Sequence, residues 1–250
     1  MKRRDYIAAA GAPTGNILEL GAFDNPIFRP ELGDNVRYLD WFSRDELIEM
    51  HKDNTRRDPN KIVNIDYVVK DHLFARHIDK RFDLISASHV IEHVADIISW
   101  LNQLESLLSD KGQIFLAIPD RRYTFDYYRQ VSQSVSMVQA HEDRLERPNK
   151  WQLAEHFYYH QKVDLDKLWA GEKPPKFQPR FTLATALRMA DEKAQSYTDA
   201  HCWVFTPPSF RQVMIDLYQS DYTGLVIKHL EGTKKGLNEF WAILEKRKPL

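Results

Sequence analysis

The chain has 250 residues, of which 43% are hydrophobic and 28% are charged, and its formal net charge is -1. This balance is typical of one globular domain that buries a substantial core. It excludes a general electrostatic attraction to nucleic acid or to an anionic membrane, and we expect neither as a partner.

The cysteine count and the hydropathy pattern indicate a cellular compartment. Cys202 is the only cysteine, so no disulfide can form within the chain, as is usual in a reducing environment. The apolar run at residues 7–10 is too short for the core of a signal peptide, and no apolar stretch has the length of a membrane span. We therefore expect a cytoplasmic protein without a membrane partner.

Five short apolar runs in the first half of the chain predict β-strands. The second run ends at Asp40 and is followed by a helix over residues 43–52 with Ser43 as its N-cap. A longer helix over residues 95–112 has one continuous apolar face, and Gly112 is expected to be its C-cap. The predicted strands cover residues 16–20, 36–42, 61–69, 81–88 and 113–119. Strands that alternate with helices predict a parallel, doubly wound α/β sheet.

The strand pattern stops between residues 120 and 200, which are rich in aromatic residues, His and Arg. We expect a mostly helical insert there, in the position of a lid, with an irregular loop around Pro174, Pro175 and Pro179. The segment has no obvious strand and no repeat. A single domain over residues 1–250 that contains this insert at 120–200 is the predicted organisation.

The pattern of helix and strand resumes after the insert. Residues 206–219 carry an apolar stripe, with Thr206 as N-cap and Pro207 in the first helical turn. Two further strands are predicted at 224–231 and 238–246. Because only the short link GTKKGL joins them, they must be antiparallel. The chain should therefore end in an antiparallel hairpin.

This layout and four local segments resemble class I S-adenosylmethionine-dependent methyltransferases. The segments are ILELGA, YLDW, FDLISASHVIEHV and LLSDKGQIFLAIPD, and the resemblance covers residues 16–120 and 203–246. It implies a Rossmann-like, seven-stranded sheet with an antiparallel last strand and S-adenosyl-L-methionine as cofactor. The segments AIPDRRYTFD, AHED and HCWVFTPPSF also resemble a bacterial group associated with cell-surface glycan synthesis. That narrower resemblance implies a small-molecule or saccharide acceptor, methylated at a hydroxyl.

Gly21 and Asp40 form the core of the predicted cofactor pocket. Gly21 begins the loop after the first strand, where a side chain would block a ligand that approaches the backbone. Asp40 lies 19 residues further on, close to the spacing at which a carboxylate meets ribose hydroxyls. The resemblance adds further cofactor contacts at Glu19, Ala22, Trp41, Asp71, His72, Ser88 and His89.

The loop after the first strand departs from the pattern of the resembled family. The usual E-x-G-x-G-x-G reads Glu19-Leu-Gly-Ala-Phe-Asp-Asn-Pro26 here, and only the first glycine remains. This disfavours a nicotinamide-dependent oxidoreductase, because a pyrophosphate needs the closely approaching glycine backbone. It also motivates an alternative function, a catalytically inactive cofactor-binding or scaffolding protein with the same fold.

His89, Glu92 and His93 form the string H-x-x-E-H, which as a bare pattern is a zinc-peptidase signature. The string follows directly on an apolar strand and precedes the long helix, so the two histidines need not share a helix face. We expect it to line the cofactor pocket or to pack, with no metal ligand. Two alternatives stay open. Quinone-pathway methyltransferases hold a divalent cation with a similar E-x-x-E-H cluster, and Glu92 with His93 can form a local hydrogen-bonded pair.

Acceptor residues are expected after the fifth strand and in the insert. A hydroxyl acceptor needs a base, and histidine has a suitable pKa of about 6.5. His201 and His141 are the predicted bases, because both lie in segments that match the narrower group. The predicted substrate-binding residues are Asp120, Arg122, Tyr123 and Asp126. The alternative is that this aromatic segment only packs over the sheet.

Overall fold

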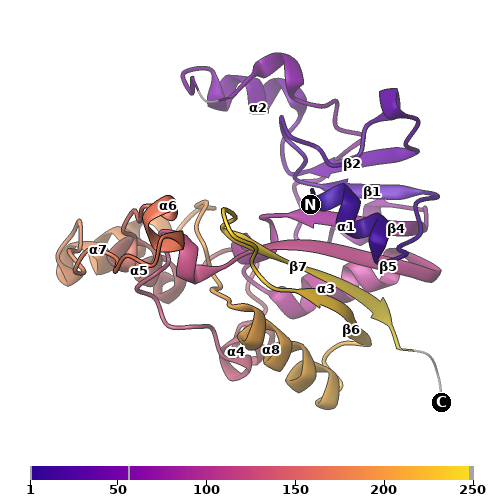
Figure 1. Ribbon diagram of the computed structural model, residues 1–250. Helices are drawn as coiled ribbons and strands as arrows, with labels where there is room; N and C mark the ends of the chain where they lie inside the picture. The colour runs from indigo at the N-terminus through magenta and orange to yellow at the C-terminus, as the bar shows by residue number, and fades with distance from the viewer. Residues whose placement is uncertain (1, 56, 248–250) are drawn as a thin grey trace.

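A seven-stranded sheet forms the centre of the molecule in the computed structural model, which describes residues 2–55 and 57–247 (Figure 1). The strand order is β3-β2-β1-β4-β5-β7-β6. The first five strands are parallel, and β7 pairs antiparallel with both β5 and β6. The strands are β1 (Ile17–Leu20), β2 (Val36–Asp40), β3 (Tyr67–Val68), β4 (Phe82–Ser88), β5 (Leu108–Pro119), β6 (Leu225–Glu231) and β7 (Glu239–Lys246). This confirms the predicted doubly wound sheet with its terminal hairpin.

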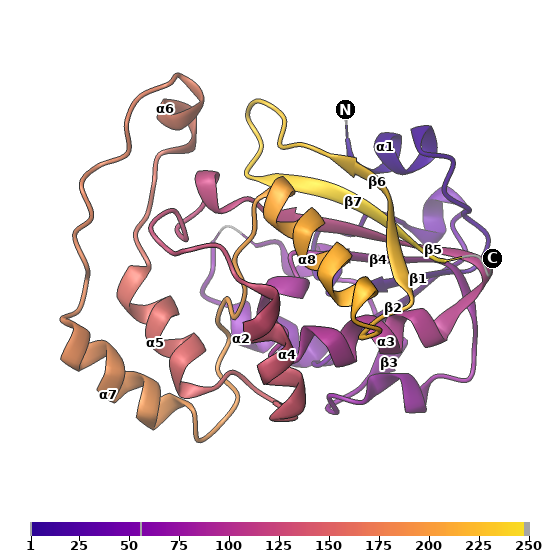
Figure 2. The same ribbon diagram turned by 90° about the horizontal axis from the view of Figure 1, so that it is seen from below.

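Helices cover both faces of the sheet, because alternate strand residues point to opposite sides. Leu18 and Ile85 face α3 (Ile97–Leu107), α4 (Ser134–Glu142) and α8 (Pro207–Gln219) in one apolar cluster. On the other face, Ile17 and Leu84 pack with Tyr6 and Ile7 of α1 (Arg3–Ala9) and with the loop after β1. Figure 2 shows α3, α4 and α8 together on one side of the sheet.

The long helix predicted over 95–112 is confirmed as α3, but its end differs. Asp96 caps it by accepting the backbone N–H of Ser99 at 2.9 Å, and the helix ends at Leu107. The sequence predicts Gly112 as the C-cap of this helix, but this prediction is wrong, because Gly112 is a residue of β5. A Cβ at position 112 would lie 2.7 Å from the carbonyl oxygen of Phe82. The glycine therefore permits the close approach of β4 and β5.

The third predicted strand, residues 61–69, shortens to Tyr67–Val68 in the structure. Lys61, the first residue of the predicted strand, belongs to the 3-10 turn η2 (Pro59–Lys61). Val63 and Ile65 then pack against the core of one sheet face without joining the sheet. Their alternation reflects burial in an extended loop, which the apolar pattern alone does not distinguish from a strand.

The insert is mostly helical, as expected, and it stands beside the carboxyl end of the sheet (Figure 1). Its helices α5 (Lys150–Tyr159) and α7 (Leu183–Lys193) pack through Leu153, Ala154 and Ala190. The prolines 174, 175 and 179 lie in the irregular stretch before α7. The remaining elements are α2 (Arg44–His51), η1 (Pro30–Leu32), η3 (Phe74–His77), η4 (Ile91–His93), η5 (Arg121–Tyr123) and α6 (Leu165–Trp169). Among the described residues, no helix is both long and apolar enough to cross a bilayer.

Candidate active site

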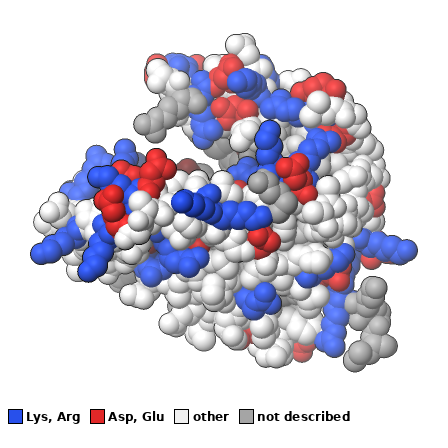
Figure 3. All heavy atoms as spheres, in the orientation of Figure 1, with Lys and Arg blue, Asp and Glu red and all other residues white. Residues whose placement is uncertain are grey.

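A cleft of about 240 Å³ lies at the carboxyl ends of β1, β2 and β3. The strand order reverses between β1 and β4, and open α/β sheets bind ligands at such a point. The space-filling view shows the surface hollowed between the part with α2 and the part with α5 to α7 (Figure 3). The walls are largely apolar and consist of Leu20, Leu39, Val69, Phe74, Val90 and Trp100. Asp40, Asp71 and Ser99 add polar groups, so the cleft suits a ligand with an apolar ring and hydroxyls.

Asp40 and Gly21 both line this cleft, as the sequence predicts. The Asp40 carboxylate accepts the backbone N–H of Phe42 at 3.0 Å, and burial raises its pKa. A carboxylate has about four acceptor sites, so Asp40 can still accept ligand hydroxyls. Gly21 has φ +62, and a Cβ there would lie 2.9 Å from Cγ2 of Val90. Glycine is thus favoured at the bend for both conformation and space.

Glu19 and Ala22, two further predicted cofactor residues, lie behind the cleft rather than in its wall. Ala22 packs in the apolar cluster beneath α1. The buried Glu19 carboxylate accepts the backbone N–H groups of Ile27 and Phe28 at 2.7 and 3.0 Å. Burial raises the pKa of Glu19 to about 7, against the lowering effect of these two hydrogen bonds. Glu19 therefore shapes the loop that follows β1.

The bend at Gly21 stays open because Phe23 turns away from it. The Phe23 ring lies 4.7 Å from the ring of His51 and beneath the guanidinium of Arg57. Neither Phe23 nor Pro26 lines the cleft.

The insert and the loop after β3 close over the cleft. The ring of Trp41 stacks on Tyr197 at 5.8 Å, and Nε2 of His72 lies 3.8 Å from the Glu146 carboxylate. Asp71, which also lies in the loop after β3, is paired with Arg76 and His77. Hydrogen bonds, first from His77, lower the pKa of Asp71 to about 2. The three predicted residues at positions 41, 71 and 72 thus line the cleft while contacting other side chains.

Ser88 ends β4 and His89 follows it, yet neither lines the cleft. His89 has φ +54, and its Nε2 lies 2.7 Å from the carboxylate of Glu239 in β7. Burial acts to raise the pKa of Glu239, but hydrogen bonds from Arg3 and His89 hold it far below its usual range. The first histidine of the H-x-x-E-H string is therefore directed toward the last strand.

Both predicted bases are paired with a carboxylate. His201 is buried, and its Nδ1 lies 2.5 Å from Asp126. His141 is half-buried, and its Nδ1 lies 2.9 Å from the helix-capping Asp96. Asp96 lines the cleft, and the ring of His201 lies 4.7 Å from that of His93, which also lines it. Each base candidate is therefore one side chain away from the cleft.

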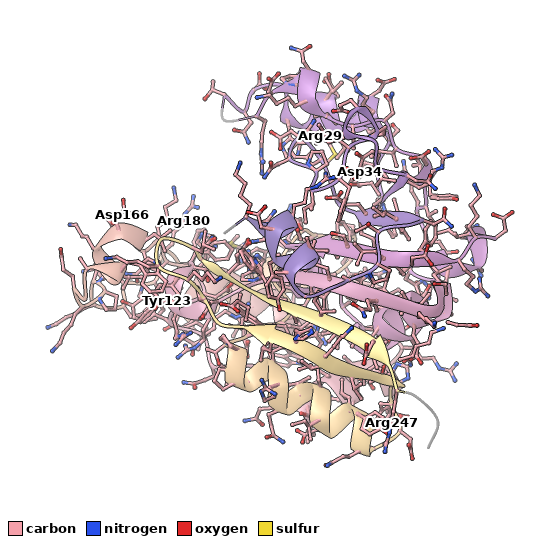
Figure 4. The ribbon with its side chains drawn as sticks, turned by 45° about the vertical axis from the view of Figure 1, so that its right-hand side comes forward. Arg29, Asp34, Tyr123, Asp166, Arg180 and Arg247 are labelled. Atoms are coloured by element: carbon pink, nitrogen blue, oxygen red, sulfur yellow. The ribbon has the colours of Figure 1, made fainter. Side chains whose placement is uncertain are left out.

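The predicted substrate residues lie together after β5, and all four contact other side chains. Asp120 is fully buried and accepts hydrogen bonds from Arg122 and from the Thr233 hydroxyl. Asp126 accepts from the buried guanidinium of Arg129 as well as binding His201. Tyr123 stacks on Trp169 of α6 at 4.2 Å, and Figure 4 shows it in the same part of the molecule as Asp166 and Arg180.

Sequence reasoning missed the parts of the cleft that come from the start of α3 and from the insert. The sequence pattern marks His93 only as part of the H-x-x-E-H string, and it marks Ser99 only as a residue of the long helix. Arg147 and Tyr197 come from the insert, whose residues carry no spacing signal that places them over the sheet. Glu92 and His93 do not form the suggested hydrogen-bonded pair, because their side chains lie 3.7 Å apart without a hydrogen bond.

One family and several solved structures are similar to this chain. The family described as "Methyltransferase domain" matches residues 1–172. The structure of the CcbJ methyltransferase from Streptomyces caelestis is 13% identical, with a TM-score of 0.48 over 98% of this chain and 89% of the other. A methyltransferase dependent on S-adenosylmethionine, from Clostridium acetobutylicum, is 9% identical, with a TM-score of 0.47 over 97% and 88%.

A third solved structure carries a different name. A protein from Rhodobacter sphaeroides, provisionally named a Zn-dependent alcohol dehydrogenase, is 13% identical, with a TM-score of 0.52 over 98% of this chain and 90% of its own. At such identity the similarity concerns the fold alone. No curated protein sequence matches the chain.

Proposed function

The chain belongs to the methyltransferase-domain family, and we propose that it transfers a methyl group from S-adenosyl-L-methionine to a hydroxyl of a sugar or glycan precursor. The observation that carries this proposal is the cleft that both Asp40 and the bend at Gly21 line. A reducing, cytoplasmic location is part of the proposal, and it rests on the single buried cysteine, Cys202.

The residues of the cleft fit this cofactor. In this proposal Asp40 accepts the ribose hydroxyls and the apolar side chains of the cleft contact adenine, with Asp71 and His72 in the same wall. The bend at Gly21 leaves room for the amino-acid tail. S-adenosylmethionine supplies a methyl group on a sulfonium and has no phosphate, so the missing glycines do not prevent binding. One face of the Trp41 ring stacks on Tyr197, and we propose that the ring also contacts the adenine.

A hydroxyl acceptor must lose its proton as the methyl group arrives, and we propose His201 for this step. Asp126 holds Nδ1 of this ring, which leaves Nε2 for the acceptor. Burial raises the pKa of Asp126, but His201 and Arg129 together lower it below its usual value, so the carboxylate stays ionised beside the ring. His141, held by Asp96, is the second candidate.

The segment after β5 supports a saccharide acceptor. Tyr123 and Trp169 form a stacked aromatic surface of the kind that packs against sugar rings. Arg122 and Asp120 add a charged pair next to it. We propose that the insert at residues 120–200 holds the acceptor over the cofactor cleft.

A second candidate function is a cofactor-binding or scaffolding protein that no longer transfers a methyl group. Two observations favour it: the loop after β1 keeps only Gly21 of the usual glycines, and Trp41 stacks on Tyr197 beside the cleft. Binding of the cofactor would be common to both functions, so only turnover distinguishes them.

Thermal unfolding in the presence of S-adenosylhomocysteine, with NADH as the comparison, tests the proposal. A ligand at one hundred times its dissociation constant adds about 2.7 kcal/mol to the free energy of unfolding. We expect stabilisation by S-adenosylhomocysteine only, followed by methyl transfer to members of a sugar and sugar-nucleotide panel. Stabilisation by NADH alone would overturn the proposal. Binding without turnover would favour the scaffolding function.

A further inference from the structure

Three side chains from two distant segments converge next to the cofactor cleft. Glu92 and His93 belong to η4, and His201 precedes α8. One carboxylate oxygen and one ring nitrogen from each histidine all lie within 4.8 Å of one another. Oε1 of Glu92 lies 3.7 Å from Nε2 of His93 and 4.0 Å from Nε2 of His201. We propose that these three side chains bind a divalent cation, with Zn²⁺ as the ion that suits them best.

The Glu92 carboxylate is the strongest sign of a missing ligand. The side chain is only 1% exposed, and neither carboxylate oxygen has a hydrogen-bond partner among the described residues. A buried carboxylate without hydrogen bonds is costly unless a cation compensates it. The backbone holds the group in place, since the carbonyl of Glu92 accepts N–H groups from Cys202 and Trp203. The two segments are thus joined where the three side chains meet.

Both histidines have the second partner that metal-binding histidines usually have. Nδ1 of His201 lies 2.5 Å from Asp126, and Nδ1 of His93 lies 2.7 Å from Asp199. The second contact has the distance of an ion pair but not the angle of a hydrogen bond. A carboxylate that accepts a hydrogen bond from Nδ1, as Asp126 does at His201, fixes the tautomer in which Nε2 carries a lone pair. Both Nε2 atoms are the ones nearest Glu92.

The charges of the cluster also favour a divalent cation. The carboxylates of Glu92, Asp126 and Asp199 lie around the two histidines, and the nearby guanidinium of Arg129 pairs with Asp126 and with a further carboxylate, Glu155, so negative charge is in excess when the histidines are neutral. Two imidazoles and one carboxylate are the donor set of many zinc sites that keep a fourth position open. An ion can enter from the cleft, because His93 lines it.

His89 approaches Glu92 as well, but it lies outside this set. Its Nδ1 is 3.6 Å from Oε1 of Glu92, while its Nε2 binds Glu239. The ligand atoms that lie within 4.8 Å of one another, in the part of the chain that the structure describes, do not include it. The H-x-x-E-H string therefore supplies two ligands, and the third comes from more than one hundred residues away.

The role of the ion, but not its binding, rests on the proposed function. An ion held by Nε2 of His201 would occupy the atom that otherwise receives the acceptor proton. It would instead polarise the acceptor hydroxyl as a Lewis acid beside the cofactor cleft, and the acceptor proton would then pass to His141, the second candidate base.

Metal binding is tested on the full chain without cofactor or acceptor. Protein stripped with EDTA and transferred to metal-free buffer is titrated with ZnCl₂ in a calorimeter, with MgCl₂ as the comparison. We expect one Zn²⁺ per chain and no measurable Mg²⁺ binding. His93→Ala and His201→Ala should each lose at least tenfold in Zn²⁺ affinity. His141→Ala, which removes a histidine with a similar carboxylate partner, should stay within twofold. Wild-type affinity in His93→Ala and His201→Ala would overturn the proposal.

Glu92→Gln separates the metal site from a metal-free cluster held by protonated histidines. The variant keeps the volume and removes the buried charge. If the Glu92 carboxylate is a metal ligand, the metal-free variant should melt at or above the temperature of the metal-free wild type. Zn²⁺ should then raise the melting temperature of the wild type only. If the variant melts lower without metal and Zn²⁺ stabilises neither protein, the cation proposal is wrong. Binding of S-adenosylhomocysteine, measured separately, reports on the proposed function whatever the outcome with Zn²⁺.

Discussion

At the scale of single residues, the Asp40 carboxylate has two roles, a hydrogen bond to the backbone and a proposed contact with the ligand. Its carboxylate accepts the Phe42 N–H, which shapes the end of β2, and it faces the cleft. An asparagine keeps one carbonyl oxygen for the backbone, but it loses the charge and one of the two acceptor oxygens that ribose hydroxyls need.

We predict that Asp40→Asn weakens binding of S-adenosylhomocysteine by about 10- to 100-fold. Hydrogen bonds to charged groups contribute about 1.5–3 kcal/mol, and each 1.4 kcal/mol corresponds to a factor of ten. Calorimetric titration measures the loss. Asp83→Asn is the matched control, because Asp83 also accepts a backbone N–H, from Asn16, but at the amino end of β4. An equal loss in both variants would show that Asp40 acts through stability rather than contact.

Gly21 and Gly33 allow the free-energy cost of a positive φ to be separated from the cost of a steric clash at the added Cβ. Both have positive φ, +62 and +85, but only a Cβ at position 21 meets another atom, Cγ2 of Val90 at 2.9 Å. We predict that Gly33→Ala lowers the free energy of unfolding by about 1 kcal/mol and Gly21→Ala by about 2 kcal/mol. Only Gly21→Ala should also weaken binding of S-adenosylhomocysteine. Urea unfolding and calorimetry measure the two effects, and equal behaviour of the variants would contradict the prediction.

The sequence identified those site residues whose position follows from the order of the strands. Gly21 and Asp40 each end or follow a strand of the parallel sheet, and such ends meet at one edge. Glu19 lies in β1, one residue before its end, but its side chain stays out of the cleft because two backbone N–H groups of the following loop need an acceptor. Tyr197 could not be predicted, since its place over the cleft depends on the packing of the insert.

At the scale of elements, periodicity predicted those helices and strands that bury a regular face. α3 and α8 have apolar stripes and good caps, and both were expected. β3 was overestimated because an extended loop buries alternate residues as a strand does. α1 was not expected: of its seven residues only Tyr6 and Ile7 are buried, too few to form a pattern.

The N-cap of α8 provides a test of element stability. Thr206 accepts the N–H of Ser209, and Ser209 accepts the N–H of Thr206 in return. We predict that Thr206→Ala costs about 1 kcal/mol of unfolding free energy, because the first turn loses an acceptor for its free N–H groups. Thr206→Ser restores the hydroxyl and should recover most of this loss in urea unfolding. If the serine variant is as unstable as the alanine variant, packing of the Thr206 methyl group would be responsible instead.

At the scale of the whole molecule, the two ends of the described chain are joined across one face of the sheet. Tyr6 of α1 packs against Trp241 of β7, with ring centroids 5.3 Å apart. Arg3 donates two hydrogen bonds to Glu239, at 2.8 and 2.5 Å. Glu239 also binds His89 at the end of β4, so α1 is connected to the strand ends that surround the site. No local pattern predicts this contact, because its partners lie 236 residues apart.

The Arg3–Glu239 pair makes stability depend on pH in a defined direction. The folded-state pKa of Glu239 lies below its unfolded value of about 4.3, so its contribution is complete above that value. The contribution is lost as the pH falls through the folded-state pKa. Arg3→Ala should destabilise the protein by about 2 kcal/mol at pH 7, because a nearly buried carboxylate loses its charged partner.

This difference between the wild type and Arg3→Ala should shrink as the pH falls below about 4, since the variant raises the folded-state pKa of Glu239 toward its ordinary value. Urea unfolding at several pH values measures the difference. Arg4→Ala is the control, because its pair with Asp34 involves a more exposed guanidinium and should matter less. A difference that does not change with pH would mean that Arg3 stabilises the protein through packing of its aliphatic stem rather than through its charge.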